Sequence, residues 1–272
     1  MFTSRAFFWL STFSFTFAAA SLPAAAVVSG VLSSTLPATG DASASPVNIG
    51  FNVNWGGTTY SQLSVNENGN ITFADAGYSD YSAGSLTQTQ RPIIAPFLAD
   101  VDLTNHGQVT YGNLMAGGKQ AFAVDYTNVG YYGDSLFGAD KTNSFQVLLI
   151  NNGTGNFGIE LNYDSIQWES GLASGGIDGL GGGSAIAGYS TTGTAAGATF
   201  ELAGSAVDGA LLDGGANSLV SDSYNARDGV SGRYDFNVVN GAVAPAPEPL
   251  SIALFAAGLV TVAAIKRKRR RG

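Results

Sequence analysis

The chain has 272 residues, no cysteine, a single histidine and a formal net charge of −8 at pH 7. Without cysteine the sequence excludes disulfide frameworks, thiolate metal sites and cysteine nucleophiles, and one histidine excludes a histidine-based metal cluster. The acidic balance also disfavours nucleic acid as a partner, because neutralising phosphates requires many Lys and Arg side chains.

The first segment has the order of a secretory signal peptide. Arg5 precedes an apolar run over residues 6–20, and Ala24 and Ala26 then supply the A-x-A pattern of a cleavage site. This order predicts export, with residues 1–26 removed by a cut after Ala26. The alternative is a buried N-terminal helix.

Short β-type runs begin after a stretch of small and polar residues. Residues 27–46 are rich in Ser, Thr, Ala and Pro, which predicts a linker or a loose first strand. From residue 47 apolar and polar residues alternate, which places one set on a single strand face: Val47, Ile49, Phe51, Val53 and Trp55.

Two predicted hairpins and one Gly/Ala-rich region complete the pattern. Asn68-Gly69 between alternating runs is a strong hairpin signal, and residues 151–156 predict a second hairpin. Residues 171–215 are dominated by Gly and Ala, which predicts loops with thin strands at 184–190 and 198–204. The sequence therefore predicts an all-β fold, a single antiparallel sandwich or barrel-like domain over 47–241.

The tail has the order of a membrane anchor. A Pro/Ala linker at 242–246 leads to Pro247, Glu248 and Pro249, then to an uncharged run over 250–265 and six basic residues at 266–271. As a transmembrane helix the run would span about 24 Å at ~1.5 Å per residue, somewhat short of the ~30 Å hydrocarbon core. The basic residues are expected on the cytoplasmic side.

Between these two ends the charge is strongly negative. The region carries five Lys and Arg residues and all twenty Asp and Glu residues, a net charge of −15. Such a surface favours solubility, and it is compatible with cation binding. The expected precursor is anchored in the inner membrane, with an N-terminal signal helix, a C-terminal transmembrane helix and its bulk outside.

Three blocks in the middle of the chain resemble the nidogen-like (NIDO) extracellular domain. Residues 92–113 hold an apolar-Pro-Phe-x-x-Asp-x-Asp run, residues 124–150 end in Asn-Ser-Phe-Gln before an apolar strand, and residues 157–171 contain Tyr163, Ile166 and Trp168. The Gly/Ala-rich stretch at 171–215 departs from that pattern in being longer and softer. The resemblance implies cell–matrix interaction rather than catalysis.

The tail is similar to the PEP-CTERM sorting signal of Gram-negative bacteria. Pro247-Glu248-Pro249, the short apolar run and the Arg-rich end stand in the expected order. The resemblance implies cleavage near Pro247–Pro249 by an exosortase, a membrane protease-transpeptidase, in an exopolysaccharide or biofilm setting. The alternative is an ordinary, permanent anchor helix.

Asp100 and Asp102 are the metal candidates. Two carboxylates two residues apart, beside Thr104 and Asn105, offer the oxygen ligands that Ca²⁺ prefers. A structural role is favoured over Ca²⁺ binding: the two residues would end a strand and accept hydrogen bonds in a turn. No organic cofactor is expected.

Tyr126, Tyr131 and Tyr132 are the candidate ligand contacts. They lie in one aromatic stretch beside Asp134 and Asp140, and exposed tyrosines can stack on sugar rings or meet a protein partner. The alternative is that about half of these aromatic residues belong to the core. His106 is expected in an exposed turn, and nothing near it resembles a nucleophile elbow.

These observations predict a non-enzymatic, adhesive or structural protein of the cell surface or extracellular matrix, sorted by an exosortase. Its expected partners are the exosortase and a matrix protein or polysaccharide. A carbohydrate-binding module for exopolysaccharide is the alternative function. A secreted hydrolase is a weaker third class, because none of the carboxylate pairs has a recognisable catalytic context.

Overall fold

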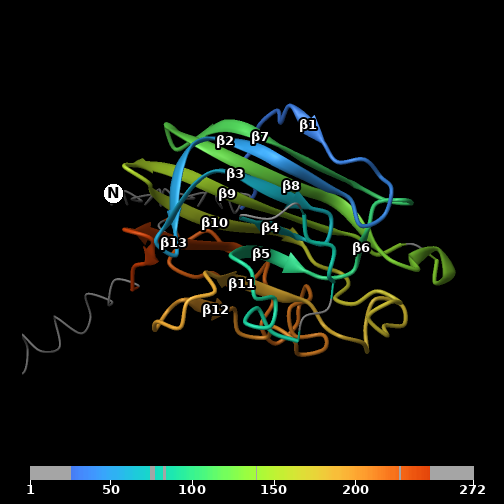
Figure 1. Ribbon diagram of the computed structural model, residues 1–272. Helices are drawn as coiled ribbons and strands as arrows, with labels where there is room; N and C mark the ends of the chain where they lie inside the picture. Colours follow the sequence, from blue (N-terminus) through green and yellow to red (C-terminus); the bar gives the residue numbers. More distant parts are fainter. Residues whose placement is uncertain (1–25, 74–76, 82–83, 139, 227, 246–272) are drawn as a thin grey trace, which may run out of the picture.

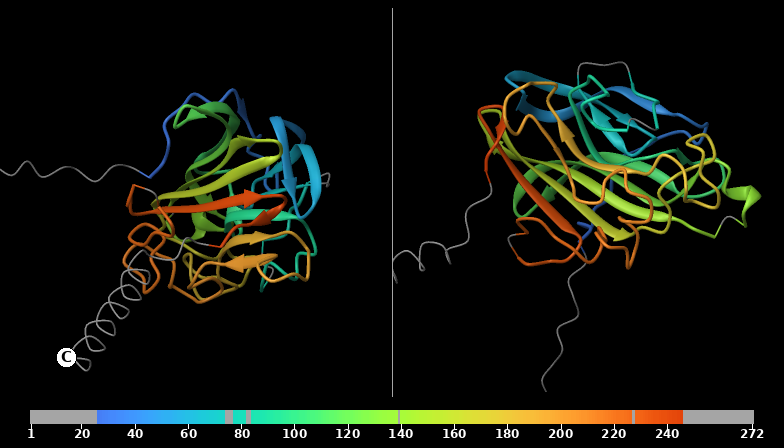
Figure 2. Two further views of the ribbon diagram at one scale, coloured as in Figure 1. Left: turned by 90° about the vertical axis from the view of Figure 1, so that its left-hand side faces the viewer. Right: turned by 90° about the horizontal axis from the view of Figure 1, so that it is seen from below.

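Two antiparallel sheets pack face to face as a β-sandwich (Figures 1 and 2). The computed structural model describes residues 26–245 except 74–76, 82–83, 139 and 227. The predicted all-β class is confirmed, and of the two predicted architectures the sandwich is the one observed. The predicted signal helix and the predicted transmembrane helix at 250–265 lie outside the described residues. Within the described part of the chain, no helix has the length and apolar character needed to cross a membrane.

The larger sheet has eight strands in the order β1-β7-β8-β9-β10-β13-β14, with β6 paired to β8. Its strands are β1 Ser34–Thr35, β6 Val101–Asp102, β7 Gln108–Ala116, β8 Lys119–Tyr131, β9 Asn143–Gly153, β10 Asn156–Ser165, β13 Arg233–Val239 and β14 Ala242–Val243. The smaller sheet has the order β12-β11-β5-β4-β3-β2. Its strands are β2 Ser43–Trp55, β3 Thr58–Asn66, β4 Asn70–Thr72, β5 Ile93–Leu98, β11 Ile186–Ser190 and β12 Thr199–Glu201, and one 3-10 helix, η1 Asp134–Leu136, follows β8.

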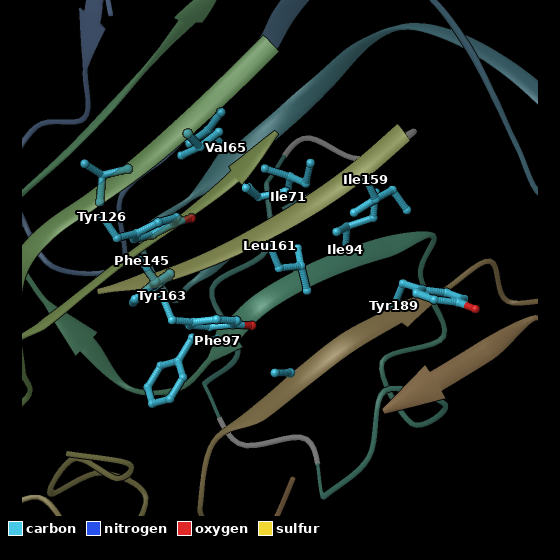
Figure 3. Close-up of a cluster of buried hydrophobic side chains, with 14 of the residues drawn as sticks. Val65, Ile71, Ile94, Phe97, Tyr126, Phe145, Ile159, Leu161, Tyr163 and Tyr189 are labelled. Atoms are coloured by element: carbon cyan, nitrogen blue, oxygen red, sulfur yellow. The ribbon is translucent and has the colours of Figure 1, made fainter. Parts of the chain in front are cut away.

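The main core lies between the two sheets. Side chains at alternate positions of each strand point inward, as the period of two along a strand requires. Val65, Ile71 and Ile94 of the smaller sheet meet Phe145 and Leu161 of the larger one, all buried (Figure 3).

Strand β5 is apolar at every position because both of its faces are buried. Ile94 and Phe97 belong to the core between the sheets, whereas Ile93 and Leu98 pack in a second cluster with Leu86. A short continuous apolar run is what a strand buried on both faces requires.

The Asn68-Gly69 hairpin is confirmed, and it is buried. Strands β3 and β4 pair up to Asn66 and Asn70, and residues 67–69 form the loop between them. Gly69 has a φ of 70°, and its carbonyl accepts the Phe97 amide at 3.1 Å. A glycine is required there, because a Cβ at Gly69 would overlap the Phe97 carbonyl oxygen.

The second hairpin and the thin strands are also confirmed. Strands β9 and β10 pair from Gly153 and Asn156 onward. Strands β11 and β12 fall inside the expected segments at 184–190 and 198–204, and the rest of 171–215 is loop.

Of the two predictions for 27–46, a linker or a loose first strand, the structure favours the strand, because this segment contains β1, which pairs with β7. Val28 exchanges two hydrogen bonds with the Gln146 side chain, at 3.0 and 2.9 Å, on the outer face of the larger sheet. Leu36 is buried, and its amide donates to Val109 at 2.9 Å. The small residues of this segment also allow its backbone to lie close to the outer face of the larger sheet, where Ala116, Ala121 and Ala123 are buried. The second linker, at 242–246, is corrected in the same way, because its first residues form β14.

Replacing Gly69 with alanine tests the buried turn. Gly69→Ala is expected to lower the free energy of unfolding by roughly 2–5 kcal/mol, the sum of about 1–2 for a left-handed backbone and about 1–3 for overpacking. The measurement is denaturant unfolding of the purified chain. Gly117→Ala is the matched control, because Gly117 also has a positive φ, 55°, but its Cβ would meet nothing within 4 Å. Equal losses in the two variants would contradict the packing argument.

Candidate functional site

The predicted site residues gather at one end of the sandwich. Asp100 lies between β5 and β6, and β6 pairs with the end of β8 by matching Val101 with Tyr131 and Asp102 with Gly130. The structure therefore brings Asp100, Asp102 and Tyr131 together, whereas Tyr126 lies farther back along β8.

Asp100 joins two loops. It is 5% exposed, and its Oδ2 accepts the Ala173 amide at 3.1 Å. Its carbonyl oxygen accepts the Tyr132 amide at 3.0 Å. A Cβ at Gly171 would overlap the Asp100 carboxyl group, so that loop approaches closely only because residue 171 is glycine.

The neighbouring acids are held by backbone amides. Glu67, 1% exposed, accepts the Ala42 amide at 2.5 Å and the Leu103 amide at 2.9 Å through its two carboxylate oxygens. Asp102 Oδ1 accepts the Thr104 amide at 2.8 Å. Buried carboxylates are stabilised by such charge-assisted hydrogen bonds without needing a cation.

The candidate Ca²⁺ site at Asp100 and Asp102 gains no third acidic, His or Cys ligand from the described residues. Among residues 26–245, outside the undescribed gaps, no three His, Cys, Asp or Glu side chains converge in a way that could hold a metal ion. The favoured structural role agrees with the geometry, since both aspartates accept hydrogen bonds from backbone amides.

Burial sets the ionisation of these acids. Burial raises the pKa of Asp100 to about 6. The backbone amides of Ala173 and Ser174 lower this pKa, whereas the nearby carboxylates of Asp41 and Asp102 raise it. Burial likewise raises the pKa of Glu67. Asp100 and Glu67 therefore take up protons more readily in the folded chain than in the unfolded one.

Two of the three candidate tyrosines are buried, which corrects the expectation that they face a ligand. Tyr126 and Tyr131 are each 1% exposed. The Tyr126 hydroxyl donates to the Asn66 carbonyl at 2.7 Å, and the Tyr131 hydroxyl donates to Asp178 at 3.3 Å. Only Tyr132, 50% exposed, can meet a ligand at the surface.

A β-bulge explains this outcome. The register of β8 against β9 shifts between Tyr126 and Val129, and Asn128 in the bulge has a φ of 50°. Strict alternation would place Tyr126 and Tyr131, five positions apart, on opposite faces of β8. The extra residue in the bulge reverses the alternation, so both side chains point inward. The sequence hinted at the bulge only through the identity of residue 128, since Asn tolerates the left-handed conformation better than most residues.

Sequence reasoning missed Asp134. This side chain in η1 is fully buried, and its carboxylate accepts Asn105 Nδ2 at 2.9 Å and lies 3.0 Å from His106 Nδ1. His106 does lie at the turn after β6, as expected, and this contact also ties it to the loop after β8. No hydroxyl group within the described residues is hydrogen-bonded to His106, so the pair lacks the nucleophile of a catalytic triad.

Glu169 was also missed. It is fully buried, and its carboxylate accepts the Gly209 amide at 2.9 Å and the Leu211 amide at 2.6 Å. Burial raises its pKa, and these two amides lower it. Together, Asp100, Asp134 and Glu169 hold the loops at this end of the sandwich in place, so the site is suited to presenting a fixed surface.

The sequence was compared with family models, curated proteins and solved structures. A family model described as NIDO related matches residues 14–210. Alpha-tectorin of Mus musculus is 30% identical over 177 residues, and that of Homo sapiens is 31% identical over the same length. Each match covers 56% of this chain and 8% of the relative, so the chain spans a small part of the curated relatives it matches. No solved structure gives a significant match.

The raised pKa of Asp100 predicts a pH-dependent stability. Because the folded pKa, about 6, lies above the ordinary value of 3.8, stability from this group is present at low pH and is lost as pH rises between these values. Asp100→Asn keeps an acceptor for the Ala173 amide and removes the titration. The variant should therefore be more stable than wild type at pH 7, by on the order of 2 kcal/mol, and similar to it at pH 4.

Thermal unfolding from pH 4 to pH 7 measures this difference. For a domain of this size the gain at pH 7 corresponds to a Tm shift of roughly 4–8 °C. Asp164→Asn, at an exposed carboxylate, is the control and should follow the wild-type curve. An Asp100→Asn curve that also runs parallel to wild type would show that this carboxyl is not the source of the pH dependence.

Proposed function

Because the chain belongs to the NIDO-related family, we propose that it is an exported, adhesive or structural protein of the cell surface or extracellular matrix. Family membership carries this proposal. The resemblance to nidogen-like extracellular domains implies cell–matrix contact, and the end of the sandwich offers loops fixed by buried carboxylates rather than a catalytic constellation. Its partner is a component of the matrix.

Export and sorting form the second part of the proposal. The Arg5, apolar run and Ala24-x-Ala26 order supports a cleaved signal peptide, and the Pro247–Pro249 segment before a short apolar run supports processing by an exosortase. Proline at 247 and 249 keeps this strip extended, because its ring removes an amide donor and blocks helix formation. An extended strip next to the membrane is what a protease cleft can bind.

The carbohydrate-binding alternative loses most of its contact surface. Tyr126 and Tyr131 are buried, so of the three candidate tyrosines a sugar ring could stack only on Tyr132. A single exposed tyrosine is a weak platform for a polysaccharide.

Localisation tests the adhesive role. The chain should be recovered with the surface or matrix fraction of the cells that produce it, and deleting its gene should reduce matrix-dependent cell aggregation. Re-expression of the wild-type chain provides the control. Recovery of the folded chain from the cytosol would contradict the proposal.

Processing is tested separately. Mass spectrometry of the surface or medium fraction should find a mature chain that begins near Val27 and ends near Pro247–Pro249. Deleting Pro247–Pro249 should leave the chain in the membrane fraction, because the protease would lose its recognition strip. Peptides from residues 250–272 in the mature protein would show a permanent anchor instead.

A further inference from the structure

Exposed apolar side chains concentrate at one end of the sandwich. Eight large hydrophobic residues are exposed in the described part of the chain, and five of them lie on the loops 132–138, 171–183 and 203–215, which we call the loop end. These five are Tyr132 at 50%, Leu136 at 70%, Leu172 at 40%, Ile177 at 70% and Val207 at 57% exposure. Exposed apolar residues scattered singly are ordinary, but such a concentration marks an interaction site.

The three loops of the loop end are joined to one another. The Leu172 amide donates to the Tyr132 carbonyl at 2.8 Å, which connects the first two loops. The Gly181 amide donates to Asp208 at 2.8 Å, which connects the second and third. At the right-hand end of Figure 1 the loops that follow β8 and β10 lie near each other beyond the strands.

Buried groups hold the loop end in a fixed shape. The Tyr131 hydroxyl and Lys141 Nζ both bind Asp178, at 3.3 and 2.7 Å, next to the exposed Ile177. Asp134, two residues before Leu136, is fully buried. Glu169 accepts the amides of Gly209 and Leu211, just after the exposed Val207. A surface that is already ordered loses little conformational entropy on binding, so its apolar contacts translate into affinity.

The charge around these residues selects the partner. Asp208 is exposed at the loop end, Asp140 is exposed just after its first loop, and neither makes an ion pair within the described residues. The neighbouring Lys141 is paired with Asp178. The region from 27 to 248 has a net charge of −15. A second copy of the chain or an anionic lipid surface would bring like charge to this rim, whereas a basic surface is attracted to it.

From these observations we propose that the loop end is the docking surface for a basic protein partner, which covers Leu136 and Ile177 with apolar side chains and faces Asp140 and Asp208 with Lys or Arg. This inference rests on the proposed function and adds the surface and the chemistry of the partner. A polysaccharide fits less well, because four of the five exposed side chains are aliphatic and offer no ring for stacking.

Site-specific photo-crosslinking in the producing cells tests the proposal. A photoreactive residue is placed in the full chain at Leu136 or Ile177, and at the control positions Val31 and Met115, which are 96% and 64% exposed but lie elsewhere. The two loop-end positions should give a defined adduct with a protein of basic isoelectric point, and the control positions should not. Raising the salt concentration should slow adduct formation.

Variants then measure the contact with the captured protein. Leu136→Ser and Ile177→Ser remove exposed side chains, so the fold should be kept, and each should weaken binding by about tenfold, as the loss of a buried aliphatic group implies. Val31→Ser and Met115→Ser are matched controls and should bind as wild type. Asp140→Asn with Asp208→Asn should mainly slow association.

Several results would overturn the inference. These are adducts of the chain with itself, with lipid, with glycan or with an acidic protein, adducts of equal yield at the control positions, or none at Leu136 and Ile177. If the chain is nevertheless found in the matrix fraction, the proposed function stands and only the docking surface is wrong. A cytosolic chain would remove the proposed function itself.

Discussion

The buried turn at Glu67–Gly69 is the constraint on which the end of the sandwich depends. Glu67 accepts two backbone amides, Asn68 Oδ1 accepts the Val101 amide at 3.0 Å, and the Gly69 carbonyl accepts the Phe97 amide at 3.1 Å. Leaving any of these buried polar groups without its partner would cost about 1–3 kcal/mol. The hydrogen bonds therefore fix β5 and the start of β6 in one position relative to the β3–β4 hairpin, and every loop beyond them is placed by that position.

Beyond this turn, the loops are held mainly by buried carboxylates that accept hydrogen bonds, rather than by salt bridges. Asp100, two residues after the end of β5, accepts amides from the loops at Tyr132 and Ala173. Asp134 holds the turn that contains His106, and Glu169 holds the last of the three loops. The chain between its two ends has few cations, whereas irregular loops have many amides with no strand partner. An acidic protein can thus order Gly-rich loops by placing acceptor-only side chains among free N–H groups.

The sequence was informative where local pattern and burial agree. Alternation placed β2 and the hairpin strands, and Asn-Gly placed the first turn, because both signals act over a few residues. Composition left a linker and a loose first strand open at 27–46, and it could not indicate that this segment packs on the larger sheet. Alternation could not assign the candidate tyrosines, because a bulge at Asn128 reverses the face of β8 between Tyr126 and Tyr131. Glu67 and Asp100 depend on amides more than twenty residues away in sequence, which no local pattern encodes.

Charge and apolar contact have different tasks at the loop end. Screening limits the reach of exposed charges to about 8 Å at physiological ionic strength, so the rim of Asp140 and Asp208 acts only once a partner is close. The same negative charge opposes self-association, which permits aliphatic side chains such as Leu136 and Ile177 to stay exposed. Once a basic surface has approached, burial of those side chains supplies the lasting part of the affinity, because the hydrophobic contribution does not weaken with salt as the electrostatic one does. The division works only if the loops do not collapse onto the core, and the buried carboxylates beneath them prevent that collapse.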